Sequence, residues 1–261
     1  MYRTATAFVI VLLGVASSVF AQAKPAQPGP PRPTPPPAID RIYISVNGAY
    51  QAGSDNFSET VTFRENAEDG TFSTDYEVKS GPAFNISVGA GLWRNIGVGV
   101  GVTRFSKSTP TAFSASVPHP FFFNRPRTVD GEVAGVAREE LAVHVQARAT
   151  FVPMERIQAV IFAGPSFFNV QQDIVSDFEV TETYPYDTAT FNRGITTSVD
   201  ESKVGFNVGA DIGYFFTRQV GVGGSLQWAG TTIDAPASAG TGTFEFKAGG
   251  FQAGAGLRLR F

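Results

Sequence analysis

Hydrophobic and polar residues alternate with a period of two along much of this chain. In residues 250–261 the even positions are glycine, glutamine or arginine, and the odd positions are all apolar: Phe251, Ala253, Ala255, Leu257, Leu259 and Phe261. Successive side chains of a β-strand point to opposite faces, so the pattern predicts a strand with one apolar face. A soluble strand with one wet face shows the same alternation, and the pattern alone does not identify the solvent.

The same alternation predicts further strands upstream, at residues 42–50, 84–92, 96–103, 141–151, 204–214 and 220–228. One more predicted strand, residues 157–169, is apolar on both faces. The pattern therefore does not show which side of this strand faces inward. Pro165 is unfavourable in the middle of a strand because proline has no backbone N–H to donate to a neighbouring strand. With the C-terminal segment, the chain is expected to form an all-β, eight-stranded antiparallel up-and-down β-barrel.

Connection lengths favour a barrel in a bacterial outer membrane. Short links at 93–95, 153–156 and 216–219 alternate with long ones at 51–81, 105–139, 170–202 and 230–242. Outer-membrane barrels have short periplasmic turns and longer external loops, and each segment is long enough for a tilted strand to cross the hydrocarbon. Aromatic residues at the strand ends are expected to form two girdles: Phe151, Tyr214 and Phe261 at the turn end, and Tyr50, Phe84 and Trp228 at the loop end.

The N-terminus is typical of a secreted chain. Residues 1–23 are interpreted as a signal peptide, with Arg3, an apolar core over 7–16 and the small-residue cleavage site Ala21-Gln22-Ala23. Residues 24–40 are rich in proline and are interpreted as a semi-rigid periplasmic linker. Residues 41–261 are assigned to the transmembrane barrel.

The last six residues, Gly256-Leu257-Arg258-Leu259-Arg260-Phe261, resemble the C-terminal assembly signal of bacterial outer-membrane barrels. From Arg41 onward, the chain resembles the small eight-stranded family of the OmpA-transmembrane-domain and OmpX type. This resemblance implies insertion by the barrel-assembly machinery, which would recognise Gly256, Leu257, Leu259 and Phe261. It also implies contact with outer-membrane lipid and lipopolysaccharide, a structural or surface-interaction role, and no peptidoglycan-binding domain after Phe261.

Composition narrows the chemistry. The chain has no cysteine, which removes disulfides, thiolate chemistry and cysteine zinc sites. It has 20 Lys+Arg against 23 Asp+Glu, so nothing points to a nucleic-acid partner. We expect no cofactor and no metal site, and a monomer is the expected oligomeric state.

Charged residues on the predicted inward faces form the first candidate site. Asp211 is expected to pair with Arg148, Arg258 or Arg260, because an unpaired buried charge costs several kcal/mol. His144 lies on the same inward side and is expected to be a hydrogen-bonding core residue. An eight-stranded barrel is just wide enough for side chains to fill it, so this network is expected to plug the lumen. The alternative is a small, gated pore for ions or small solutes.

The long connections form the second candidate site. Phe121, Phe122 and Phe123, with Arg125, place consecutive aromatics outside the membrane, where they either bind an extracellular ligand or fold over the mouth. Acidic residues in 55–77 and 173–187 lack the spacing of a cation-binding loop. No enzyme signature is found; a lipid-modifying enzyme is the remote alternative and would require a nucleophile beside His144. The function expected is a surface-interaction, adhesion-type barrel.

Overall fold

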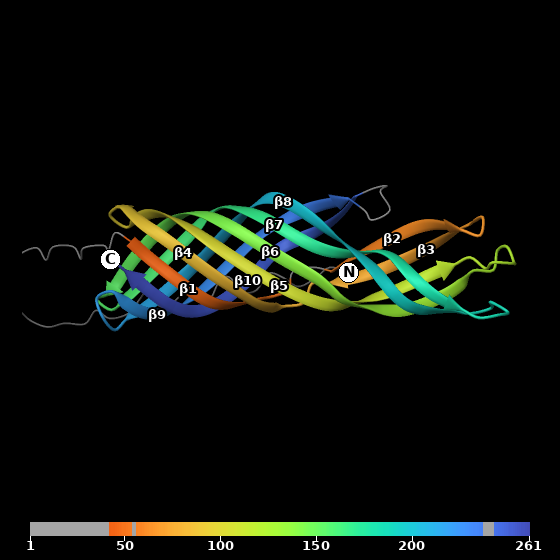
Figure 1. The fold of residues 1–261 in the computed structure, drawn as a ribbon. Coiled ribbons are helices and arrows are strands. Elements are labelled where there is room, and N and C mark those ends of the chain that lie inside the picture. Colours follow the sequence, from red (N-terminus) through yellow and green to blue (C-terminus); the bar gives the residue numbers. More distant parts are fainter. Residues whose placement is uncertain (1–41, 54–55, 237–242) are drawn as a thin grey trace, which may run out of the picture. The chain divides into compact units, whose positions relative to one another are not determined.

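The computed structural model describes residues 42–53, 56–236 and 243–261 (Figure 1). The described residues form ten strands: β1 (Ile42–Gln51), β2 (Asn56–Glu65), β3 (Glu68–Glu77), β4 (Gly81–Trp93), β5 (Ile96–Val117), β6 (Arg127–Met154), β7 (Ile157–Glu182), β8 (Ala189–Phe215), β9 (Val220–Pro236) and β10 (Thr243–Arg260). The predicted signal peptide, 1–23, and linker, 24–40, lie outside the described residues.

Eight of the ten strands close into an antiparallel ring, in the order β1-β4-β5-β6-β7-β8-β9-β10. The first and last strands pair from Tyr43↔Arg260 to Gln51↔Gln252. The backbone N–H groups of Ile42 and Phe261 each donate to the other residue's carbonyl, at 3.0 and 2.9 Å. The predicted closure of the last strand on the first is confirmed, and it leaves no unpaired edge at this seam.

The ring presents its apolar residues outward and its polar residues inward. On β4, Phe84, Ile86 and Val88 are exposed, whereas Asn85 and Ser87 are buried. The six residues predicted for the two girdles are all exposed: Phe151, Tyr214, Phe261, Tyr50, Phe84 and Trp228. The outer surface is therefore apolar and the lumen polar, the reverse of a water-soluble barrel.

The structure assigns the faces of β7, the predicted strand that was apolar on both sides. Gln158, Phe162 and Ser166 are buried and point inward, and Pro165 is exposed. The β6–β7 register has no partners between His144↔Ser166 and Ala147↔Ala163, the stretch where Pro165 has no N–H to donate. The inward residues of β7 are partly apolar because they pack against arginine and histidine side chains in the lumen.

The long connections were predicted as polar loops, and for most of their length this was wrong. Connection 51–81 contains the hairpin β2–β3, so the sheet has two strands more than predicted. Connections 105–139 and 170–202 are continuations of the ring strands, which run to Val117 and from Arg127, and to Glu182 and from Ala189. The error arose because the apolar residues, which face outward in the predicted strands, face inward in these continuations.

The face change is clearest on β5. Its outward residues are apolar up to Val102 and polar from Arg104 onward, whereas its inward residues change from glycine to Phe105, Phe113 and Val117. We call the part of the structure beyond this level the extension: β2, β3 and residues 105–139, 169–203, 231–236 and 243–248. Figure 1 shows it as the end from which the hairpins project. The extension has the apolar interior and polar exterior of a soluble protein.

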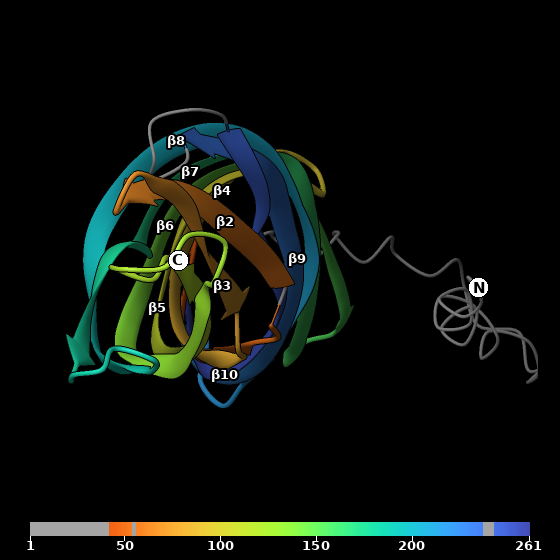
Figure 2. The same cartoon turned by 90° about the vertical axis from the view of Figure 1, so that its right-hand side faces the viewer.

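The interior of the extension is a continuous aromatic and aliphatic cluster. It includes the buried residues Val61, Phe72, Phe113, Val129 and Ile174. The hairpin β2–β3 pairs with the far end of β5, from Thr71↔Ser116 to Asp75↔Ala112, and Figure 2 shows it across the opening of the ring. Phe57 of β2 stacks on Phe244 and Phe246 of β10, with ring centroids 5.5 and 5.4 Å apart. This cluster covers that end of the lumen.

Candidate functional site

A buried charge pair in the lumen joins β8 to β10. Arg258 donates to Asp211 through both Nε and Nη2, at 2.9 and 2.6 Å, and through Nη1 to Asn47 at 2.6 Å. The Tyr43 hydroxyl donates to the same carboxylate. Arg258 is fully buried and Asp211 nearly so. Among the three arginines predicted as partners, Arg258 is the one that forms the ion pair. The bidentate geometry and the added hydrogen bonds offset part of the cost of burying the pair.

His144, on the inward face of β6, is fully buried. Its Nε2 is 3.0 Å from the Thr103 hydroxyl and 3.2 Å from Gln227, and its Nδ1 is 2.7 Å from the Ser166 hydroxyl. The serine neighbour was missed because Ser166 lies on β7, whose inward face was unassigned. The pair belongs to a polar network that continues through Asn207, which donates to Ser166 at 2.8 Å.

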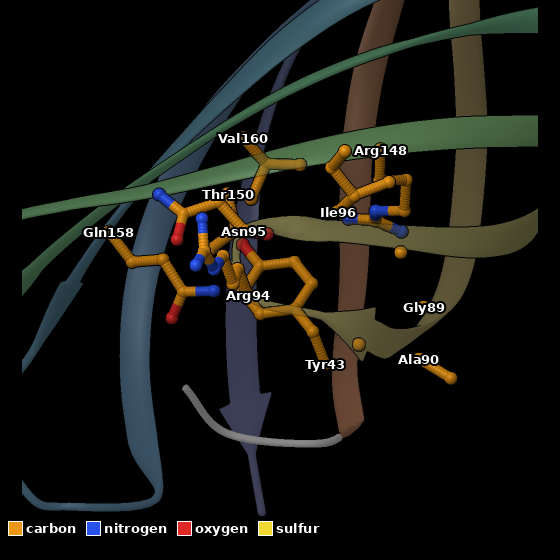
Figure 3. A pocket seen from close by; sticks show the side chains of 12 residues that line it. Tyr43, Gly89, Ala90, Arg94, Asn95, Ile96, Arg148, Thr150, Gln158 and Val160 are labelled. Carbon is orange, nitrogen blue, oxygen red and sulfur yellow. The ribbon is translucent and has the colours of Figure 1, made fainter. Parts of the chain in front are cut away.

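Arg148 occupies the lumen near the turn end, 5% exposed. Its guanidinium lies over the Tyr43 ring at 5.1 Å and the Phe162 ring at 6.0 Å, two cation–π contacts. The inward glycines Gly89 and Gly99 make room for it, since a Cβ there would lie 2.8 and 2.7 Å from Arg148 side-chain atoms. A small cavity of about 20 Å³ lies beside it, lined also by Gln158 and by Arg94 of the β4–β5 turn (Figure 3).

Arg260, the other predicted partner of Asp211, lies at the rim instead. It donates to the carbonyls of Arg218 at 2.9 Å and Glu155 at 3.2 Å, and it lies over the Phe215 ring at 4.0 Å. Arg260 therefore ties the last strand to the two neighbouring turns. The residues of the predicted assembly signal lie beside it: Leu257 and Phe261 are exposed on the outer face, Leu259 is half-buried, and Gly256 contacts the backbone of β1.

A second buried charge network, missed in the sequence, lies at the boundary with the extension. Arg138 Nε donates to Glu140 Oε1 at 2.7 Å, and both residues are buried. Glu140 Oε2 also accepts from Gln51 at 3.1 Å and from the Gly249 N–H at 2.9 Å. The signal available was that the alternation of β6 continues upstream of Leu141, which puts Arg138 and Glu140 on the inward face. The predicted strand began only at Leu141, after both residues, whereas β6 begins at Arg127.

The tip of the extension carries the predicted aromatic site. Phe121, Phe122 and Phe123 are 67%, 51% and 69% exposed, and Arg125 lies over the Phe122 ring at 5.4 Å. Tyr184, from the β7–β8 hairpin, is 82% exposed. We call these five residues the tip platform. All five side chains are exposed.

Buried polar residues hold the tip platform in place. Arg127 donates to the carbonyls of Pro118 at 2.7 Å and Tyr186 at 3.2 Å, and pairs with Glu182 at 2.6 Å, so it joins the two hairpin tips. His119 Nδ1 accepts the N–H groups of Phe121 and Phe122, at 3.1 and 3.2 Å. The exposed rings are thus carried by turns whose backbone is hydrogen-bonded.

Within the described residues, no group of three or more His, Cys, Asp or Glu has the geometry to hold a metal ion. In the same part of the chain, no helix is long and apolar enough to span a membrane.

Comparisons with known proteins give structural resemblances only. No family model and no curated protein sequence matches the chain. Neisserial surface protein A is 10% identical, with a TM-score of 0.41 and coverage of 84% of this chain and 97% of that one. The outer membrane protein OprG from Pseudomonas aeruginosa is 9% identical, with a TM-score of 0.46 and coverage of 85% and 96%. Ail, the attachment invasion locus protein of Yersinia pestis, is 13% identical, with a TM-score of 0.38 and coverage of 85% and 99%. Over most of its length the chain thus resembles small outer-membrane β-barrels.

Proposed function

We propose that the chain is a bacterial outer-membrane β-barrel that acts at the cell surface through the tip platform, with its lumen closed. The proposal that the ring lies in a membrane rests on one observation: the outward residues are apolar in the ring and polar in the extension. On β10 the outward apolar band runs from Phe251 to Phe261. At about 3.3 Å per residue and a tilt of about 40°, it rises roughly 25 Å, the height of the apolar band of such barrels.

The exposed aromatics carry the surface-interaction part. A soluble surface has no reason to hold three consecutive phenylalanines in water, and aromatic residues with an arginine are typical of binding hot spots. The hydrogen bonds of His119 and Arg127 hold the turns that carry them, which reduces the entropy lost on binding. The proposed partner is an extracellular ligand that offers apolar or anionic groups to the tip platform.

The lumen contents support a closed barrel over a pore. Arg258, His144 and Ser166 are fully buried, and the charge pairs Asp211–Arg258 and Arg138–Glu140 lie at two levels of the lumen. The buried Ser166–His144 pair does not favour a lipid-modifying enzyme. The hydrogen-bond partners of His144 are Thr103, Ser166 and Gln227, none of them a carboxylate, and both members of the pair are fully buried. We therefore propose a non-enzymatic role without a cofactor.

The membrane proposal is tested by fractionation. The expected result is a protein that is extracted from the outer membrane by detergent and that migrates faster on a gel before boiling than after it. A protein recovered in solution from the periplasm, without heat-modifiable migration, would show that the apolar faces are covered by something other than lipid.

The tip platform is tested with the triple variant Phe121→Ser, Phe122→Ser and Phe123→Ser. We expect bacteria displaying the variant to lose most of the adhesion shown by the parent chain on surfaces coated with matrix protein or glycan, because the exposed rings provide the contact area. Heat-modifiable migration should be unchanged. Ile195→Ser, an exposed apolar residue elsewhere on the extension, is the matched control. Equal adhesion of the triple variant and the parent chain would eliminate this site.

A further inference from the structure

At the turn end of the lumen lies a buried cation, Arg148, that forms no ion pair with a carboxylate among the residues that the structure describes. Three other buried arginines each pair with a carboxylate: Arg258 with Asp211, Arg138 with Glu140, and Arg127 with Glu182, at 2.6, 2.7 and 2.6 Å. Asp211 also attracts Arg148, but both its oxygens are held by Arg258. Arg148 Nη1 is buried and has no hydrogen-bond partner in the structure.

Among the described residues that line the lumen, from the turn end up to and including the boundary pair Arg138–Glu140, the buried arginines exceed the buried carboxylates by one positive charge. Arg148, Arg258 and Arg138 are the cations, and Asp211 and Glu140 the anions. The unpaired charge is costly, because an ion buried without a partner loses several kcal/mol of hydration. The cation–π contacts with Tyr43 and Phe162 compensate for part of this loss and neutralise none of the charge.

The cavity beside Arg148 has the size and lining of a small-anion site. Its volume of about 20 Å³ exceeds the roughly 10–15 Å³ that one water requires. Arg94 of the β4–β5 turn also lines it; this residue is exposed and its guanidinium lies over the Trp93 ring at 5.5 Å. Thr150 is a further lining residue and carries a hydroxyl (Figure 3). The site lies within the ring and next to a turn, so an ion enters from that end without passing the Asp211–Arg258 pair.

Gln158 supplies the second orphaned group of the same cavity. It is 4% exposed and its Oε1 has no hydrogen-bond partner. An amide turned by 180° occupies the same space and presents its NH₂ group instead of its oxygen. In that orientation Gln158 donates to an anion held by Arg148, whereas in the other it accepts from a bound water.

We propose that the cavity formed by Arg148, Gln158, Thr150 and Arg94 binds one small inorganic anion of the size of chloride. The ion supplies the counter-charge that the lumen lacks and receives hydrogen bonds from the guanidinium Nη1 and from the amide of Gln158. A bulky organic anion does not fit the volume. The site is separate from the tip platform, so its test is independent of the adhesion experiment.

Thermal unfolding of the detergent-extracted, folded protein in chloride and in gluconate, at equal ionic strength, tests the site. We expect a higher unfolding temperature in chloride, with a difference that grows with chloride concentration as one-site binding requires. Gln158→Glu places a carboxylate in the cavity that Arg148 also lines. This variant should unfold at the same temperature in both salts. Arg148→Met, which removes the cation and keeps the volume, should also lose the difference.

Arg104→Gln is the matched control, because it removes an arginine of the exposed Arg104–Glu139 pair and leaves the cavity intact. It should keep the full chloride effect. Crystals grown in bromide should show an anomalous peak within hydrogen-bond distance of Arg148 Nη1 in the parent protein and none in Gln158→Glu. Equal unfolding in the two salts for the parent protein, with a water and no bromide in the cavity, would overturn the proposal.

Discussion

At the residue scale, the contact between the last strand and the first depends on one glycine. A Cβ at Gly256 would lie 1.8 Å from the Val46 carbonyl oxygen and 2.9 Å from the Asn47 Cα, which are backbone atoms that cannot rotate away. Gly48, on the facing strand, has nothing within 4 Å of the same position. Two glycines of similar appearance in the sequence therefore have different roles.

Gly256→Ala is expected to destabilise the folded protein by about 1–3 kcal/mol, because the added methyl group forces the β1–β10 backbones apart. Gly48→Ala should be neutral or stabilise by up to about 1 kcal/mol, because it reduces the freedom of the unfolded chain. Urea unfolding of the two variants in the same micelles measures the difference. Equal unfolding midpoints for the two variants would contradict the role assigned to Gly256.

The sequence predicts the face of a lumen residue but not its partner. Asp211, Arg148 and Arg258 all lie on inward faces, as the alternation requires. Which arginine meets the carboxylate depends on the stagger between strands, and the alternation of a single strand carries no information about stagger. The tip aromatics were predicted from three consecutive phenylalanines in a long connection, whereas the supporting contacts of Arg127 depend on two hairpins meeting in space.

At the scale of elements, the strands of the ring were predictable and the strands of the extension were not. Within the ring, outward apolar residues against inward glycine and polar residues make a clear pattern. In the extension the outward residues are polar and the inward ones aromatic, as in β5 beyond Arg104. Because the outward apolar face ends at that point, the pattern predicts a loop there. The hairpin β2–β3 was missed for the same reason, since Val61 and Phe72 point inward.

Phe72→Ala is expected to loosen the extension without opening the ring. Phe72 is buried and lies 5.4 Å from Phe178 and 5.8 Å from Phe113, ring centroid to ring centroid. Truncating a buried phenylalanine costs about 3–5 kcal/mol, and here the cost is confined to contacts beyond the ring. We expect faster protease cleavage in the hairpin β2–β3 on intact cells, with heat-modifiable migration retained. Tyr184→Ala, at an exposed ring, should leave cleavage unchanged; equal cleavage of both variants would place the core elsewhere.

At the scale of the whole molecule, the ring and the extension bury opposite kinds of residue, and the boundary between them is closed by charge. The exposed pair Arg104–Glu139, 3.1 Å apart, lies on the outer surface at this level, and the buried pair Arg138–Glu140 lies inside. Two layers of buried ion pairs therefore separate the turn end of the lumen from the extension. Each layer also joins strands distant in sequence, such as β1, β6 and β10 through Gln51, Glu140 and Gly249.

The closed lumen leads to a prediction about conduction. In planar bilayers the parent protein is expected to show no steady conductance, because Asp211 and Arg258 fill the lumen together with Tyr43 and Asn47. Asp211→Ala alone leaves Arg258 unpaired and should cost about 3–5 kcal/mol in stability.

The double variant Asp211→Ala and Arg258→Ala removes both charges and both side chains, so it should be less destabilised than the single variant. It should also show no steady conductance, because the Arg138–Glu140 pair and the aromatic cluster of the extension still close the other end of the lumen. Steady channels of equal conductance in the parent protein and the double variant would mean that this pair does not close the lumen, and the small-pore function would then replace the closed barrel.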